Sequence, residues 1–190
     1  MAAFYFFMME RYISFLRGIN VGGHKKILMS ELKRCFEELG LKNVATYIQS
    51  GNVVFSTDEK IAPGELSKII EHKIAESFGF EVPVIVRTYE QLQQITRKNP
   101  FLKNKMVNPE KCYVTFLSEQ PLQELVNQIS KLDFMPDEFL VAGHDVYLHI
   151  PDRYSDTKLS NDFFEKKLHV RATSRNWKTI NTLVEMANEK

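Results

Sequence analysis

The stretch RGINVGGHKK, Arg17–Lys26, combines basic side chains with closely spaced glycines directly after an apolar run. Arg17, Lys25 and Lys26 supply positive charge. Glycine lets the backbone approach a ligand and turn its N–H groups toward it, and Asn20 can both donate and accept hydrogen bonds. This chemistry suits a phosphate or a carboxylate. The candidate ligand-binding residues of this loop are Arg17, Asn20, Gly22, Gly23, Lys25 and Lys26.

The glycine spacing excludes the common phosphate-binding motifs. Gly18, Gly22 and Gly23 fit neither the G-x-x-x-x-G-K-[ST] loop nor the G-x-G-x-x-G pattern. The loop is nevertheless long, because about a dozen residues separate the expected strand from the next helix, and connections of about 2–6 residues are typical. Two interpretations remain open: an anion or polar-ligand site, and a turn at Gly22-Gly23 with a solvated basic tip.

A second basic segment, KKLHVRATSRNWK at Lys166–Lys178, contains no acidic residue. Thr173 or Ser174 would cap a helix that begins here. Arg175 and Asn176 would then lie at the positive end of that helix, where anions bind favourably. The alternative is a solvated basic face, or a helix end paired with acids elsewhere in the chain. The candidate ligand-binding residues of this segment are Arg171, Arg175 and Asn176.

The segment QSGNVVF, Gln49–Phe55, predicts a hairpin in which Ser50 and Gly51 form a two-residue turn. Gln49, Ser50 and Asn52 could face a ligand and join the candidate site residues, although a purely structural turn is the commoner use of such a pattern. The third strand, NVVF, lacks the aligned stacking aromatics of an RNA-recognition module, which disfavours that module.

The sequence shows no motif for metal binding or covalent catalysis. No H-E-x-x-H spacing occurs among the five histidines. Cys35 and Cys112 form no C-x-x-C pair and have no histidine nearby in sequence, so we expect buried thiols in a reducing compartment. We expect no metal and no cofactor. The sequence identifies no catalytic residue, and whether the protein is an enzyme is left open.

The overall charge limits the kind of basic site that can be present. The chain has 190 residues, with 25 basic and 24 acidic side chains and a formal net charge of +1. This balance argues against a non-specific nucleic-acid coat, so a basic site must be local. No segment is long and apolar enough to span a bilayer, and the N-terminus lacks a basic leader and a cleavage site. We expect a cytoplasmic protein, with Met1–Met8 as an extension upstream of Met9.

The elements that must position these residues are expected in the order β-α-β-β-α-β, the split β-α-β or ferredoxin-like arrangement. Hydrophobic periodicity and turn residues predict strands over 11–17, 45–49, 52–57 and 82–88, and helices over 30–40 and 63–79. Ser30 is the expected N-cap of the first helix, and Pro63 and Gly79 bound the second.

The pattern then restarts after a linking helix and loop. Strands are expected over 111–118, 138–143 and 145–151, and helices over 121–130 and 158–168. A closing helix over 174–189 takes the place of the last strand. We therefore expect an α+β fold of two ferredoxin-like (split β-α-β) halves with a C-terminal helix. The expected boundaries are 9–88 for the first half, 89–110 for the linking helix and loop, and 111–190 for the second β-α-β-β-α half with its closing helix.

Three segments together resemble a known family. They are LRGINVGG at Leu16–Gly23, TYIQSGNVVF at Thr46–Phe55 and ATSRNWKTINTL at Ala172–Leu183. They look like the blocks of the bacterial domain-of-unknown-function family 1697, and the resemblance spans the chain from about Met9 to the end. It implies a cytoplasmic α+β protein of ferredoxin-like halves, and no catalytic residues, because the family has no established activity. Ser174 departs from the pattern, since many relatives have alanine there.

These observations favour an uncharacterised protein that binds an anion through the Gly-rich basic loop and the basic helix N-terminus. The candidate partners are a nucleotide, a nucleic acid or a phosphorylated small molecule, and a membrane is not among them. Two alternatives stay open. One is an enzyme that acts on a phosphorylated or acidic small molecule, and the other is a structural or protein-partner module. The oligomeric state does not follow from the sequence.

Overall fold

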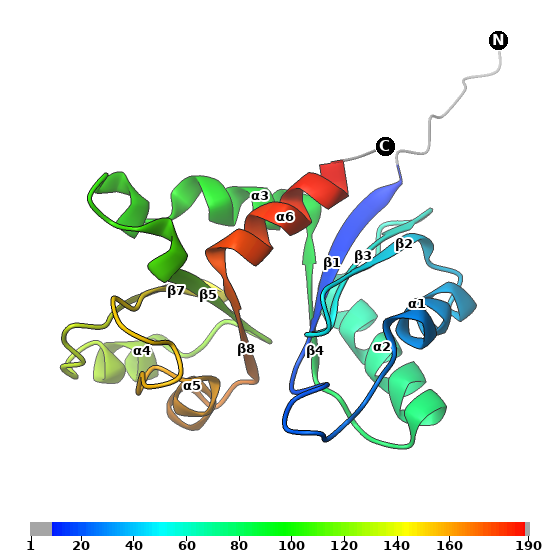
Figure 1. Ribbon diagram of the computed structural model, residues 1–190, viewed down its shortest axis with the longest axis horizontal. Helices are drawn as coiled ribbons and strands as arrows, with labels where there is room; N and C mark the ends of the chain where they lie inside the picture. Colours follow the sequence, from blue (N-terminus) through cyan, green and yellow to red (C-terminus); the bar gives the residue numbers. More distant parts are fainter. Residues whose placement is uncertain (1–8, 189–190) are drawn as a thin grey trace, which may run out of the picture. The chain divides into compact units, whose positions relative to one another are not determined.

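The computed structural model describes residues 9–188, which form two compact units (Figure 1). Of the described residues, the first unit contains 9–91 and 185–188, and the second contains Leu92–Val184. The expected extension Met1–Met8 lies outside the described residues. Helices α3 (Tyr89–Lys98) and α6 (Trp177–Asn188) each carry the chain from one unit to the other.

The first unit is a four-stranded antiparallel sheet with two helices. Its elements are β1 (Glu10–Leu16), α1 (Met29–Glu38), β2 (Lys42–Tyr47), β3 (Asn52–Thr57), α2 (Pro63–Phe78) and β4 (Val84–Thr88). The strand order is β2-β3-β1-β4, and every neighbouring pair is antiparallel. Each helix thus connects two strands that have a third strand between them, as the sequence predicts for a split β-α-β arrangement.

The second unit repeats this order with different residues. Two short 3₁₀ helices, η1 (Phe101–Lys103) and η2 (Pro109–Lys111), precede the first strand of this unit. Its elements are β5 (Cys112–Leu117), α4 (Gln123–Ile129), β6 (Glu138–Ala142), β7 (Asp145–His149), α5 (Asn161–Leu168) and β8 (Ala172–Asn176). The sheet order is β6-β7-β5-β8, again antiparallel throughout. The α+β class with a C-terminal helix is therefore confirmed.

The closing helix starts later than expected, because the residues before it form strand β8. Residues 172–176 pair with β5 in a register that joins Leu117 to Ala172 and Tyr113 to Asn176. The apolar helical spacing begins only at Trp177, and the preceding threonine and serine favour extended backbone once a neighbouring strand is available to pair with them. The second unit therefore has a fourth strand at residues for which the sequence pattern predicted a helix.

The hairpin turns and helix ends show where local sequence signals were sufficient to predict the structure and where they were not. Gly143 and His144 form the expected two-residue turn between the paired residues Ala142 and Asp145. The predicted two-residue turn at Ser50-Gly51 is wrong, because the strands pair only up to Tyr47 and Asn52 and leave a turn of residues 48–51.

Helix α2 begins at Pro63 and ends before Gly79, which adopts φ 76°, as expected. The N-cap of α1 is Leu28 rather than Ser30, and no side chain caps that helix.

The core of the first unit lies between its sheet and helices α1 and α2. Tyr12 and Phe55 stack with their ring centroids 5.6 Å apart, and Phe36 of α1 meets Phe55 edge-on at 5.6 Å. The Tyr12 hydroxyl is also satisfied, since it donates to the Ile61 carbonyl at 2.9 Å. This core supports the loops at the ends of β1 and β3. No helix among residues 9–188 has the length and apolar character needed to cross a membrane.

Candidate functional site

Asn20 organises the long loop between β1 and α1. Its Nδ2 donates to the Ile27 carbonyl at 3.0 Å and to the Gln49 carbonyl at 2.9 Å, while its Oδ1 accepts from the Ile27 N–H at 3.0 Å. Its own N–H donates to the Lys25 carbonyl at 3.2 Å. The amide thus joins both ends of the loop to the β2–β3 turn. Its residue type is explained by this internal role, because only an amide donates and accepts in this way.

The two adjacent glycines form a tight turn at the tip of the loop. Gly22 and Gly23 have φ angles of 58° and 80°, and the His24 N–H donates to the Val21 carbonyl at 3.1 Å. Two successive positive φ angles favour glycine at both positions. Of the two interpretations of the glycines, the structure favours the turn, with the basic residues on its exposed side.

The β2–β3 turn, residues 48–51, packs against the same loop. The Gly51 carbonyl accepts from the Leu16 N–H at 2.8 Å. A Cβ atom at Gly51 would lie 2.7 Å from Leu16 Cβ, so this position excludes a larger residue. Asn52 Nδ2 donates to the Tyr47 carbonyl at 3.1 Å and to Ser50 Oγ at 3.0 Å. The family-like blocks LRGINVGG and TYIQSGNVVF are therefore in direct contact through their backbones.

The turns and hydrogen bonds described above do not explain the positive charge of the loop. Lys25 and Lys26 are exposed, and Lys25 Nζ donates to the Glu81 carbonyl at 2.6 Å. Both lysines precede α1, whose N-cap Leu28 offers no side-chain hydrogen bond. A helix N-terminus carries partial positive charge and free N–H groups. Arg17 is half-buried, and its N–H donates to the Pro83 carbonyl at 2.9 Å.

The second basic segment is built differently from the sequence prediction. Arg175 lies on β8, half-buried, and its Nη1 donates to Thr173 Oγ1 at 2.9 Å and to the Ser174 carbonyl at 2.8 Å. Burial lowers the pKa of Arg175 to about 10, and the nearby Tyr154 opposes this change.

Asn176 is the N-cap of helix α6, because its Oδ1 accepts from the Thr179 N–H at 2.8 Å. The predictions that Thr173 or Ser174 caps this helix and that Arg175 lies at its start are therefore wrong, whereas Asn176 does lie at the start of the helix. The exposed Arg171 lies just before β8, and its N–H donates to Ser118 Oγ at 3.1 Å. A cleft shared by this segment and the Gly22 loop stays a prediction, since the two belong to different units.

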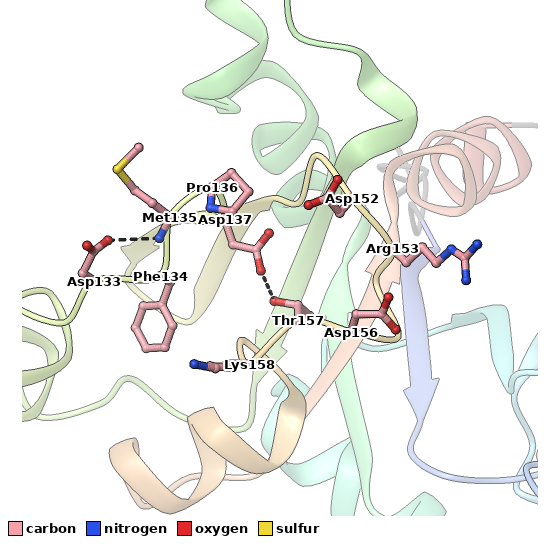
Figure 2. Close-up of a pocket in the computed structure, with 10 residues that line it drawn as sticks. All are labelled: Asp133, Phe134, Met135, Pro136, Asp137, Asp152, Arg153, Asp156, Thr157 and Lys158. Carbon is pink, nitrogen blue, oxygen red and sulfur yellow. Dashed lines mark hydrogen bonds between the residues drawn. The ribbon is translucent and has the colours of Figure 1, made fainter.

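A pocket in the second unit was not predicted from the sequence. It has a volume of about 250 Å³ and lies between the loop before β6 and the loop after β7 (Figure 2). The two loops are joined by the Thr157 hydroxyl, which donates to Asp137 Oδ2 at 2.5 Å. The lining carries a net negative charge, because it contains four aspartates and two basic residues: Asp133, Asp137, Asp152 and Asp156, with Arg153 and Lys158. Each loop contributes two of the aspartates, and only the tertiary structure brings the two loops together.

The two cysteines lack the lowered pKa of a reactive thiol. Burial raises the pKa of the Cys112 thiol to about 11 and also raises that of Cys35, so neither is a thiolate near neutral pH. Both cysteines are free and buried, as expected. Among residues 9–188, no three histidine, cysteine, aspartate or glutamate side chains are grouped to hold a metal ion.

The comparisons with known proteins place the chain by family and fold. The solved structure of "conserved bacterial protein SP0830 from Streptococcus pneumoniae" is similar to this chain with a TM-score of 0.75 and 23% sequence identity. The alignment covers 95% of this chain and 99% of that one, so the two share a fold. No curated protein matches the chain.

The family model described as "Protein of unknown function (DUF1697)" matches residues 9–147. This match includes the first two sequence blocks and stops before the third. With most of the chain matched and the fold shared along nearly its whole length, the resemblance seen in the sequence is confirmed, and the chain belongs to the DUF1697 family.

Proposed function

We propose that this protein binds an anionic ligand through the loop of residues 17–28, and that a phosphate group is the anion. The observation that carries the proposal is the junction of Lys25 and Lys26 with the start of α1, which no side chain caps. Ammonium groups and unsatisfied backbone N–H groups are the two kinds of donor that phosphate oxygens prefer. The candidate ligands are a nucleotide, a nucleic acid and a phosphorylated small molecule.

The rigidity of the loop supports this proposal. Because Asn20 bonds to both ends of the loop and to the neighbouring turn, the lysines start from a fixed backbone. A fixed site loses less conformational entropy when a ligand binds than a disordered basic segment does. Arg17, at the start of the loop, adds a planar guanidinium that suits phosphate. Arg171, Arg175 and Asn176, like Gln49, Ser50 and Asn52, remain predicted contacts in this proposal.

The test is a comparison of ligand binding in the wild type and in the double variant Lys25→Ala, Lys26→Ala. We expect the wild type to bind ATP or a labelled oligonucleotide, measured by calorimetry and by fluorescence anisotropy, and the variant to bind at least about tenfold more weakly. Affinity should fall with added salt, because phosphate contacts release counterions.

A matched control removes two lysines elsewhere. Lys166→Ala with Lys167→Ala makes the same change of charge at the last turn of α5 and should bind like the wild type. Equal binding by the wild type and the Lys25 and Lys26 variant would show that the loop is not the site. Phosphate binding that survives while oligonucleotide binding is absent would identify a small ligand.

A further inference from the structure

Three exposed apolar residues of the first unit lie next in sequence to Asn20 and to the residues that its amide bonds. Val21, Leu28 and Ile48 are 65%, 65% and 50% exposed. They are the sequence neighbours of Asn20, Ile27 and Gln49, the three residues that the Asn20 hydrogen bonds hold together. We call Val21, Lys25, Lys26, Leu28 and Ile48 the basic hairpin surface. Apolar side chains gathered beside cations on a solvent-exposed surface are typical of a contact with another macromolecule.

The backbone conformation of Ile48 is unfavourable, in addition to the exposure of its side chain. Its φ angle is 49°, a region that β-branched residues rarely adopt. Asparagine or glycine at this position would relieve the strain and also remove an exposed apolar group. A residue that costs stability in two ways points to a role outside the folding of the single chain.

The pocket of the second unit, here called the acidic pocket, is lined by four aspartates against Arg153 and Lys158, and its net negative charge complements the basic hairpin surface. None of its four aspartates forms an ion pair with a lysine or arginine among the residues that the structure describes. In Figure 2 the Arg153 side chain extends away from the Asp137 carboxylate. Apolar groups accompany the acids here too, since Leu132 is 46% and Met135 83% exposed beside Asp133.

We propose that the basic hairpin surface of one copy of this chain docks at the acidic pocket of a second copy. The ammonium groups of Lys25 and Lys26 pair with the pocket aspartates, and the apolar groups of the two surfaces cover each other. Among the described residues, neither Lys25 nor Lys26 forms an ion pair with a carboxylate, and the pocket aspartates form none with a lysine or an arginine. A nucleic acid fits the apolar part of the surface less well, because the side chains there are aliphatic and stack poorly on bases.

This proposal goes beyond anion binding, and it predicts a particular kind of assembly. Each copy carries one basic and one acidic surface, and the contact joins unlike surfaces. The association should be salt-sensitive, because it is in large part electrostatic. A phosphate ligand on the loop would compete with it.

The experiment measures mass by light scattering after size-exclusion chromatography, over a range of concentrations. We expect the wild-type mass to rise above that of the monomer with concentration and to fall with added salt. Lys25→Glu with Lys26→Glu should be monomeric, and so should Asp152→Lys with Asp156→Lys. Combining all four changes restores opposite charges across the contact and the net charge of +1, so it should restore the association. Far-UV circular dichroism checks that each variant is folded.

Two further variants sharpen the test. Lys166→Glu with Lys167→Glu makes the same charge change on α5 and should associate like the wild type. Ile48→Asn relieves the backbone strain, so it should raise the stability of the monomer and weaken the association. A wild type that is monomeric at every concentration, or an association unchanged by either pair of reversals, would overturn the proposal. If the loop variants lose phosphate binding while the mass is unchanged, only the self-association is wrong.

Discussion

At the scale of single residues, the structure separates positions that hold the fold from positions that face solvent. Asn20, Gly22, Gly23, Gly51 and Asn52 all take part in turns or internal hydrogen bonds. Lys25 and Lys26 of the same loop are exposed, and Arg17 is half-buried. The chemistry that the loop can offer a ligand therefore resides in its cations and its backbone N–H groups, on a frame that its polar and glycine residues build.

Gly51→Ala is predicted to destabilise the protein because the new methyl group has no room. It would lie 2.7 Å from Leu16 Cβ and 2.8 Å from Ile19 Cδ1, on a backbone with φ 73°. Overpacking and an unfavourable φ together should cost about 2–4 kcal/mol of unfolding free energy in urea titrations. Gly40→Ala is the control, since its Cβ meets nothing within 4 Å at a similar φ. Equal losses in the two variants would show that φ alone matters.

At the scale of elements, Asn176 joins a strand to a helix. It is the last residue of β8, paired with Tyr113, and its side chain caps α6. One residue thus ends the sheet and begins the helix. The RNW part of the third sequence block therefore lies at the junction of a strand and a helix.

Asn176→Ala is predicted to lower stability by about 1 kcal/mol, the usual cost of losing an N-cap. Asn176→Asp should retain most of the stability, because a carboxylate accepts the same Thr179 N–H and suits the positive helix end. Thermal unfolding and urea titrations measure both variants. An alanine variant as stable as the wild type would contradict the capping role.

At the scale of the whole molecule, two units share one strand order while their residues differ. Each unit keeps one free cysteine, Cys35 in the first and Cys112 in the second, and both are buried. Their protonation is tied to folding because burial favours the neutral thiol. This coupling makes global stability dependent on pH in the alkaline range.

Stability is predicted to fall as the pH rises from about 9 to about 11. Burial raises the pKa of Cys112 from 9.0 to about 11, so in this range the folded protein keeps a proton that the unfolded chain releases. The contribution is complete below pH 9 and is lost as the pH rises through the folded pKa. Urea titrations at several pH values should show a steeper fall for the wild type than for Cys112→Ala. Parallel curves would show that the thiol is not responsible.

Much of the fold was predictable because its signals are local. Pro63 and Gly79 mark the ends of α2, and Gly143-His144 marks a two-residue turn. The incorrect predictions have their causes in contacts between residues that are far apart in sequence. The β2–β3 turn is longer than its Ser-Gly pair suggests because Asn20 and Leu16 hold its backbone. Residues 172–176 became a strand because β5 had an edge free to pair.

The sequence by itself determined the family, the α+β class, the order of all α-helices and strands but one, and the basic character of the loop. These follow from residue types and from spacing along the chain. Only the tertiary structure showed that Asn20 ties the loop to the β2–β3 turn, that Asn176 caps a helix instead of exposing its end, and that two loops with two aspartates each line a pocket. Such contacts join residues far apart in sequence, and their partners are set by strand order and register, which no local pattern records.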